Sequence, residues 1–304
     1  MTHPVEANVP PYGLAPWTLA RFCAPYGFCS SDGTPTPWEP IVAQPLRAFL
    51  TSYQDGLTTG VTHVALLDTR ALTETSIAQR YLAHLPAATQ ARLARIHHPE
   101  RRAESLGGRL LVASFARLLG QTLREDPPYA PLLEASESAT GLWDVSLAHS
   151  HGIATLALEA LPPETARPQV ALDLERVRPR PTIQEIVTHS LGDAFWERLT
   201  TFSSPEDPHA TLLAFYRLWG EYECAIKLAR FSTLPYRVRQ ATRPHDGFTL
   251  CDPQGNAWAS QAFLLAAPTR DALETPFVLT VAQRTLQPVH VYHLTLNDAL
   301  AYVD

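Results

Sequence analysis

Short apolar runs with strand-like spacing recur along the chain. VTHVALLD occupies residues 61–68, and WDVSLAHS and IATLALEA flank His151 and Gly152. Successive side chains on a strand point to opposite faces, so these runs predict strands, and the His-Gly step predicts a hairpin turn. The remaining strand predictions all fall in the second half: QVALDLE, FTLCD, AWASQAFLLA, FVLTVAQ and VHVYHLTL.

Apolar residues spaced by three and four predict helices in four other stretches. These stretches are residues 73–95, 100–120, 182–199 and 209–230. Residues 124–142 show neither period, so a loop is expected there.

Strand, helices and antiparallel-type strands follow one another in each half of the chain. This order predicts an α+β protein of two pseudo-symmetric lobes, each a small antiparallel sheet packed with helices. The expected boundaries are residues 61–165 for the N-terminal lobe and 166–304 for the C-terminal lobe. Residues 1–60 are rich in proline, glycine and aromatic residues and are expected to form an irregular N-terminal extension.

Composition favours a globular, soluble chain. It has 304 residues, is 45% hydrophobic and carries a formal charge of −6, which gives no overall basic field for a polyanion. We therefore expect no nucleic-acid partner. No uninterrupted apolar run reaches the roughly 18 residues of a membrane span, and the N-terminal residues lack a signal-peptide pattern. A cytoplasmic protein without a membrane partner is the expectation.

Acidic residues and a unique lysine fall at informative positions. On a strand, QVALDLE would present Ala171, Asp173 and Glu175 on one face and its other apolar residues on the opposite face. On a helix, Trp219, Glu223 and Lys227 are spaced by four and form one stripe.

Each of these features has a structural alternative. An acidic pair on a strand can be a solvated edge, and a Glu–Lys pair four residues apart is an ordinary helix contact worth about 0.2–0.5 kcal/mol. Trp219 fits a helix core equally well. Lys227 is the only lysine among 24 Lys and Arg residues, and its retention could be chance.

Taken together, the motifs resemble those of the 4′-phosphopantetheinyl transferases of the surfactin-synthetase-activating type. ALDLE at residues 171–175 is similar to the G-[IV]-D-[IV]-E strand motif of that family, and WGEYECAIK at 219–227 to its W-x-x-K-E-[AS]-x-x-K helix motif. SLAHS at 146–150 resembles [NS]-[IL]-S-H-S, and LGGRLL at 106–111 resembles an element of the N-terminal lobe. The resemblance covers about residues 61–285.

The resemblance implies an enzyme that moves the phosphopantetheine arm of coenzyme A onto a serine of an apo acyl or peptidyl carrier protein. The product would be 3′,5′-ADP, and the protein would be a monomer. Asp173, Glu175 and Glu223 would hold Mg²⁺, which prefers hard oxygen ligands. Glu223 and Lys227 would be catalytic.

The resemblance also implies contacts to coenzyme A. His149 would lie near the 3′-phosphate, Lys227 near the diphosphate, and Arg101 and Arg102 would be further phosphate contacts. A lysine is a compact charge with a transferable proton, which suits it to a reacting phosphate better than arginine. A solvated helix face is the alternative for the two arginines.

Four positions depart from the family motifs. Ala171 replaces glycine, Tyr222 replaces lysine, Cys224 replaces a smaller residue, and Ala148 replaces serine. These departures motivate an alternative, a non-catalytic relative of the same fold that binds carrier proteins. A magnesium phosphohydrolase using the same acids is a third hypothesis.

Overall fold

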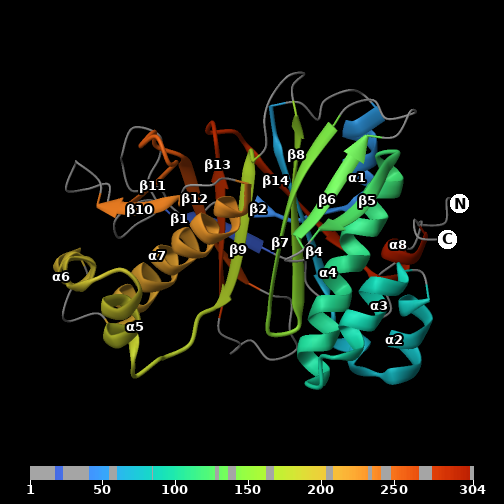
Figure 1. Cartoon of the computed structure of the whole chain (residues 1–304), viewed down its shortest axis with the longest axis horizontal. Coiled ribbons are helices and arrows are strands. Elements are labelled where there is room, and N and C mark those ends of the chain that lie inside the picture. The colour runs from blue at the N-terminus through green and yellow to red at the C-terminus, as the bar shows by residue number, and fades with distance from the viewer. Residues whose placement is uncertain are drawn as a thin grey trace, which may run out of the picture.

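The chain forms a mixed α+β structure with two five-stranded sheets at its centre (Figure 1). This structure is a computed structural model. It describes residues 18–22, 41–54, 60–83, 85–126, 130–135, 142–161, 168–202, 208–231, 235–240, 248–266 and 276–301.

The first sheet is mixed. Its strands, in spatial order, are β3 (Gln44–Pro45), β14 (Val289–Leu294), β4 (Thr62–Asp68), β8 (Ile153–Leu161) and β7 (Leu142–Ser150). β14 runs parallel to both β3 and β4, while β4, β8 and β7 pair antiparallel. The expected purely antiparallel sheet is therefore wrong for this half, because β14 reaches it by a crossover and no hairpin sets its direction.

The second sheet is antiparallel throughout. Its strands, in spatial order, are β2 (Ile41–Val42), β1 (Thr18–Phe22), β12 (Ala259–Ala266), β13 (Phe277–Gln283) and β9 (Val170–Arg176). The register between β9 and β13 runs from Val170 opposite Gln283 to Arg176 opposite Phe277. β9 is thus an edge strand of this sheet, as β7 is of the first.

The helices cover the outer faces of the two sheets (Figure 1). On the first sheet lie α1 (Leu46–Gln54), α4 (Pro99–Leu118) and α8 (Leu296–Ala301), with α2 (Thr75–Leu82) and α3 (Ala87–Ala94) packed around α4. On the second sheet lie α5 (Ile183–Ser190), α6 (Asp193–Phe202) and α7 (Pro208–Leu228).

Local sequence explains where α4 begins and ends. Pro99 occupies the first turn, where its missing N–H costs nothing, and Glu100 beside it favours the positive end of the helix dipole. Gly120 follows the last turn with φ of 63°, a left-handed conformation that glycine adopts without strain. The resulting helix buries a long apolar face, with Leu111 and Phe115 under the first sheet.

The apolar core fills the space between the two sheets. It contains Val64 and Leu66 from β4 and Leu172 and Leu174 from β9, all buried. Ala171 faces the opposite way, into the cluster beneath α7. The alternation expected for QVALDLE is therefore confirmed.

Most of the expected elements are present. The strands at β4, β7, β8, β9, β11 (Phe248–Cys251), β12, β13 and β14 coincide with the apolar runs. The helical stretch 73–95 is a 3₁₀ turn η1 (Arg70–Thr73) followed by α2 and α3, and 182–199 is divided between α5 and α6. The hairpin turn is also confirmed, because His151 and Gly152 join β7 to β8 with positive φ.

Two expectations are wrong for the described residues. The loop expected at 124–142 contains part of a hairpin of β5 (Gln121–Asp126) and β6 (Ala130–Ala135). The extension expected at 1–60 contains α1, β1, β2 and β3, although the rest of it lies outside the described residues. A short strand can be held by backbone hydrogen bonds to a neighbouring strand without an alternating apolar pattern in its own sequence. The sequence pattern therefore did not reveal these strands.

A strand near each end of the chain joins the sheet formed mainly by the other half of the sequence. β1 pairs with β12, whereas β14, near the other end of the chain, lies beside β4. Sheet membership therefore does not coincide with the expected boundaries at 60/61 and 165/166. None of the helices in the described part of the chain combines the length and apolar character that a membrane crossing needs.

Candidate functional site

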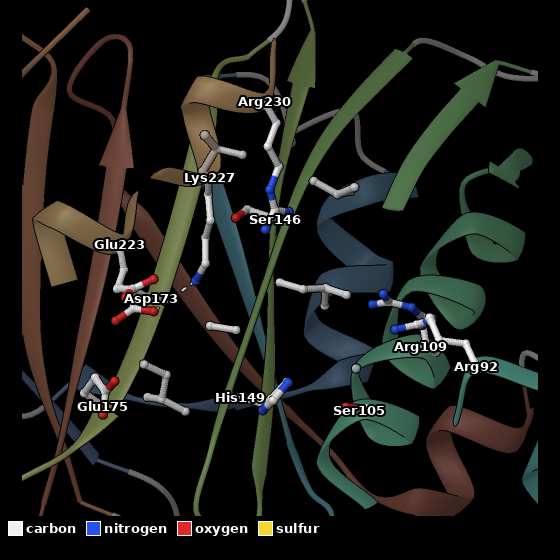
Figure 2. Close-up of a pocket in the computed structure, with 16 residues that line it drawn as sticks. Arg92, Ser105, Arg109, Ser146, His149, Asp173, Glu175, Glu223, Lys227 and Arg230 are labelled. Atoms are coloured by element: carbon white, nitrogen blue, oxygen red, sulfur yellow. Dashed lines mark hydrogen bonds and ion pairs between the residues drawn. The ribbon is translucent and has the colours of Figure 1, made fainter. Parts of the chain in front are cut away.

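A cavity of about 380 Å³ lies where the two edge strands β7 and β9 meet, between α7 and α4 (Figure 2). Its floor is the seam between the two strands. One wall carries acids from β9 and α7, and the other carries basic residues from α3 and α4. The two walls therefore present side chains of different charge to a ligand.

The acidic wall begins with Asp173 and Glu175 on β9. Their even spacing on the strand points both side chains away from the inter-sheet core and toward α7. Asp173 is 7% exposed, yet its Oδ2 atom is buried and has no hydrogen-bond partner. A buried carboxylate oxygen without a donor is costly, so this atom is suited to a cation brought by a ligand.

Glu223 and Lys227 on α7 complete this wall. Lys227 Nζ donates to Asp173 Oδ1 at 2.9 Å and to the Leu172 carbonyl oxygen at 2.6 Å (Figure 2). The i, i+4 pairing alternative for Glu223 and Lys227 is thus not the main contact of this lysine. Its partner comes from the neighbouring strand.

The electrostatics of the acidic wall reflect burial and crowding. Burial first, and the Asp173 charge second, raise the pKa of Glu175 to about 7. The same two causes raise the pKa of Glu223, although Lys227 and Arg230 oppose them. Burial alone would lower the pKa of Lys227, but Asp173 and Glu223 outweigh it and the pKa is raised. The lysine therefore keeps its positive charge, which favours charge stabilisation over proton donation.

Trp219 belongs to the helix core and does not line the cavity. It stacks on Phe215 with a centroid distance of 6.1 Å and packs against Tyr222. The core alternative weighed for this residue agrees with these contacts.

His149 lies on β7 and points into the cavity (Figure 2). Its Nδ1 atom is 3.0 Å from Glu104 Oε2 on α4, and the other oxygen of Glu104 accepts the Gly152 N–H at 2.7 Å. Burial raises the pKa of Glu104, but the hydrogen bonds from His149 and Gly152 outweigh it and the pKa is lowered. An ionised Glu104 thus fixes the orientation of the imidazole.

The basic wall differs from the sequence-based expectation. Arg101 is exposed and Arg102 half-buried in the first turn of α4, and neither lines the cavity. Arg109 and Arg92 line it instead, and Arg230 lies above Lys227 (Figure 2). The reason is position along the helix: Arg101 shares a helix face with Ser105 and Arg109, but it lies one and two turns before these cavity-lining residues.

Sequence reasoning missed Glu104, Arg109 and Arg230 as functional candidates. A signal for two of them was present, because Glu104 and Arg109 are charged residues on the mainly apolar, buried face of a predicted helix. A buried charge is placed there only when it has a partner. Arg230 carries no such signal, since it follows α7 in the 3₁₀ turn η2 (Ala229–Phe231).

The acids of the cavity are candidate ligands for magnesium. Within the described residues, no group of three or more His, Cys, Asp or Glu side chains is arranged to hold a metal ion. Asp173, Glu175 and Glu223 all face the cavity, however, and Asp173 Oδ2 lacks a donor. Magnesium commonly takes one or two carboxylates and completes its shell with phosphate and water oxygens, so these residues fit an ion that arrives with a phosphorylated ligand.

Comparisons with known proteins add no constraint on this site. The chain matches no protein-family model, and a search of curated proteins also finds no match.

Proposed function

We propose that the protein is a magnesium-dependent phosphopantetheinyl transferase. It would transfer the 4′-phosphopantetheine arm of coenzyme A to a serine of an apo acyl or peptidyl carrier protein. The motif resemblance supplies the reaction class. The observation that carries the proposal is the two-sided cavity, in which Asp173, Glu223 and Lys227 face Arg109 and His149 across the seam.

The charges of the cavity suit a ligand with two separate phosphate groups. Arg92, Arg109 and His149 would bind the 3′-phosphate, since guanidinium and imidazole N–H groups both donate to phosphate oxygens. Lys227 would lie against the diphosphate on the other side. Coenzyme A carries both groups.

The transfer itself is a displacement at phosphorus. The serine oxygen forms a bond to the phosphorus that bears the pantetheine arm, while the bond from that phosphorus to the bridging oxygen breaks. The electron pair of that bond stays on 3′,5′-ADP. The serine proton would pass to an oxygen of Glu223 that does not hold the Mg²⁺. Lys227 stabilises the charge that develops on the leaving phosphate.

Asp173, Glu175 and Glu223 would hold Mg²⁺ together with phosphate oxygens of the ligand. When bound, the ion supplies positive charge that offsets the repulsion between a nucleophile and a diphosphate. Lys227 already occupies Oδ1 of Asp173, and the buried Oδ2 atom has no hydrogen-bond partner.

The departures from the family motifs support an active enzyme over a non-catalytic relative. Ala171 and Cys224 are buried in the core beneath α7, and Tyr222 packs against that core. None of the three lines the cavity. Ala148 alone does, so three of the four departures are packing changes away from the ligand.

We also propose that the two sheets and their long helices are related as pseudo-symmetric lobes. The support is the matching length of α4 and α7, 20 and 21 residues, each on the outer face of one sheet. The pseudo-symmetry between the two sheets is imperfect, because β1 belongs to the second sheet and β14 to the first.

The test of the proposed function is mass spectrometry of a panel of apo carrier proteins incubated with the protein, coenzyme A and Mg²⁺. We expect a mass gain of one phosphopantetheine arm on at least one carrier. Free phosphate, assayed in parallel, should stay at background. Phosphate release without a carrier would indicate a phosphohydrolase, and carrier binding without modification would indicate the non-catalytic alternative.

Two variants give this assay a matched control. Glu223→Gln removes a charge of the acidic wall, whereas Glu185→Gln removes an exposed charge on α5 outside the cavity. We expect transfer to fall by about 10²–10³ in the first variant and to remain unchanged in the second.

A further inference from the structure

Lys227 has few hydrogen-bond donors left for a ligand. A lysine ammonium group has three N–H donors, and Lys227 already donates to Asp173 Oδ1 at 2.9 Å and to the Leu172 carbonyl oxygen at 2.6 Å. A diphosphate carries charged oxygen atoms on both of its phosphorus atoms. A ligand of this class therefore needs further donors on the same side of the cavity.

Arg230 lies where such donors are needed. It belongs to η2, about one helical turn after Lys227, and it lines the same cavity. Glu223, Lys227 and Arg230 are spaced by four and then three residues, which places them along one side of a helical segment. Figure 2 shows the side chains of Lys227 and Arg230 both directed into the cavity.

The guanidinium group of Arg230 is not engaged by other side chains. Within the described part of the chain it has neither a hydrogen bond nor an ion pair, and Glu223 acts on it from beyond ion-pair distance. Arg180 is different, because its guanidinium lies 3.6 Å from Glu175 and donates to the Tyr216 hydroxyl at 3.1 Å. The five N–H donors of Arg230 thus remain available to a ligand.

A structural role is the alternative for Arg230. A cation in or just after the last turn of a helix interacts favourably with the negative end of the helix dipole. That role needs no contact with a ligand. It affects the stability of the protein, whereas a ligand contact affects a dissociation constant, so the two roles can be separated by measurement.

We propose that Arg230 is a ligand-binding residue that contacts the diphosphate group beside Lys227. Its planar guanidinium can donate two N–H groups to phosphate oxygens at once, while the remaining donor of Lys227 contacts a third oxygen. The arginines of the basic wall, Arg92 and Arg109, are then left for the 3′-phosphate. The identity of the ligand as coenzyme A rests on the proposed function.

Two ligands that differ only in the 3′-phosphate separate the two anion sites. Calorimetry in the presence of Mg²⁺ measures the dissociation constants of coenzyme A and of 3′-dephospho-coenzyme A. Arg230→Gln removes the charge beside Lys227, and Arg92→Gln removes a charge of the basic wall. Arg237→Gln is the matched control, because Arg237 is exposed on β10 (Arg237–Gln240) and does not line the cavity.

We expect Arg230→Gln to raise the dissociation constants of both ligands about tenfold, because both contain the diphosphate. Arg92→Gln should weaken coenzyme A by a similar factor and leave 3′-dephospho-coenzyme A within about twofold. Arg237→Gln should change neither. A loss confined to coenzyme A in Arg230→Gln overturns the proposal and assigns Arg230 to the 3′-phosphate. Unchanged affinities with a lower melting temperature also overturn it and indicate the helix-end role.

Inorganic pyrophosphate with Mg²⁺ tests the contact without coenzyme A. Arg230→Gln should raise its dissociation constant about tenfold, and Arg237→Gln should not. Failure of the unsubstituted protein to bind pyrophosphate overturns the proposal. If the expected losses occur but no carrier protein is modified, this inference stands and the proposed function falls. Modification of a carrier together with unchanged affinities in Arg230→Gln has the reverse meaning.

Discussion

Lys227 is held by two oxygen atoms of one strand, the Asp173 carboxylate and the Leu172 carbonyl. Its side chain is 16% exposed, so the charge lies in a largely dry environment, where it acts more strongly than in water. A lysine suits this position because its single nitrogen donates to both oxygens as a compact point charge. The uniqueness of this lysine in the sequence and its contacts thus point to the same site.

We expect Lys227→Met to lower the turnover of carrier modification by about 10²–10³, because methionine keeps the length of the side chain and loses the charge. Lys227→Arg should restore only part of this rate, since charge returns without the compact shape. Steady-state transfer measures both effects, with circular dichroism as the check on folding. A methionine variant as fast as the unsubstituted protein would make the lone lysine an accident of composition.

Glu159 on β8 is a second residue whose environment makes a measurable prediction. It is 4% exposed, and burial, followed by the effect of Asp144 across the β7–β8 pair, raises its pKa to about 7 despite a hydrogen bond from Thr62. A carboxyl group with a raised pKa in the folded state is neutral in both states at low pH. As pH rises from about 4.5 to about 7, the unfolded chain ionises first, and the folded state loses stability.

Glu159→Gln should therefore stabilise the protein in a pH-dependent manner. The gain in the free energy of unfolding should be near zero at pH 4 and reach up to about 3 kcal/mol above pH 7, since each unit of pKa shift corresponds to about 1.4 kcal/mol. Urea unfolding at a series of pH values measures it. The prediction fails if the difference between the two proteins is the same at every pH.

At the scale of the elements, one glycine sets how closely α7 approaches its sheet. A Cβ atom on Gly220 of α7 would lie 2.2 Å from Thr280 Oγ1 on β13, a distance that requires movement of the helix or the strand. A Cβ atom on Gly108 of α4 would meet only Leu147, at 3.7 Å, which is an ordinary contact. The position of Glu223 and Lys227 over β9 thus depends on Gly220.

Gly220→Ala should destabilise the protein by about 1–3 kcal/mol through overpacking and should lower the affinity for Mg²⁺ with coenzyme A. Gly108→Ala is the matched control. It should be neutral or stabilise α4 by up to about 1 kcal/mol, because alanine restricts the unfolded chain more than glycine does. Thermal unfolding and calorimetry separate the two, and similar melting temperatures would show that α7 can shift without cost.

The strand and helix that carry the acids were predictable because their apolar periods are undisturbed. In QVALDLE the alternation alone gave the faces of Asp173 and Glu175, and both faces are as expected. The basic wall was not predictable in the same way. Arg92 and Arg109 come from two separate helices, and only their packing shows which turn of each helix faces the seam.

At the scale of the whole molecule, the crossing of the chain ends ties the two sheets together. The apolar pattern predicted the strands but could not reveal this, since a short strand has the same pattern in either sheet. β14 follows the second sheet in sequence and pairs with β4 in the first, where Val291 and Tyr292 are buried. Residues 61–165, the expected N-terminal lobe, therefore do not include β14, although β14 belongs to the sheet of that lobe.

Removal of residues 289–304 distinguishes independent lobes from one cooperative unit. If the lobes were independent, the deletion would leave the sheet of β4, β8 and β7 intact, because these strands lie far from 289–304 in the sequence. The structure predicts the opposite: β4 would lose its parallel partner, and Phe49 and Phe115 would lose the packing of Tyr292. Burial of a large aromatic side chain contributes about 3–5 kcal/mol, a large part of the stability of a domain. We expect the full chain to unfold in one transition and the truncated chain to show no cooperative transition. Retention of a cooperative transition in the truncated chain would show that residues 61–165 fold without β14.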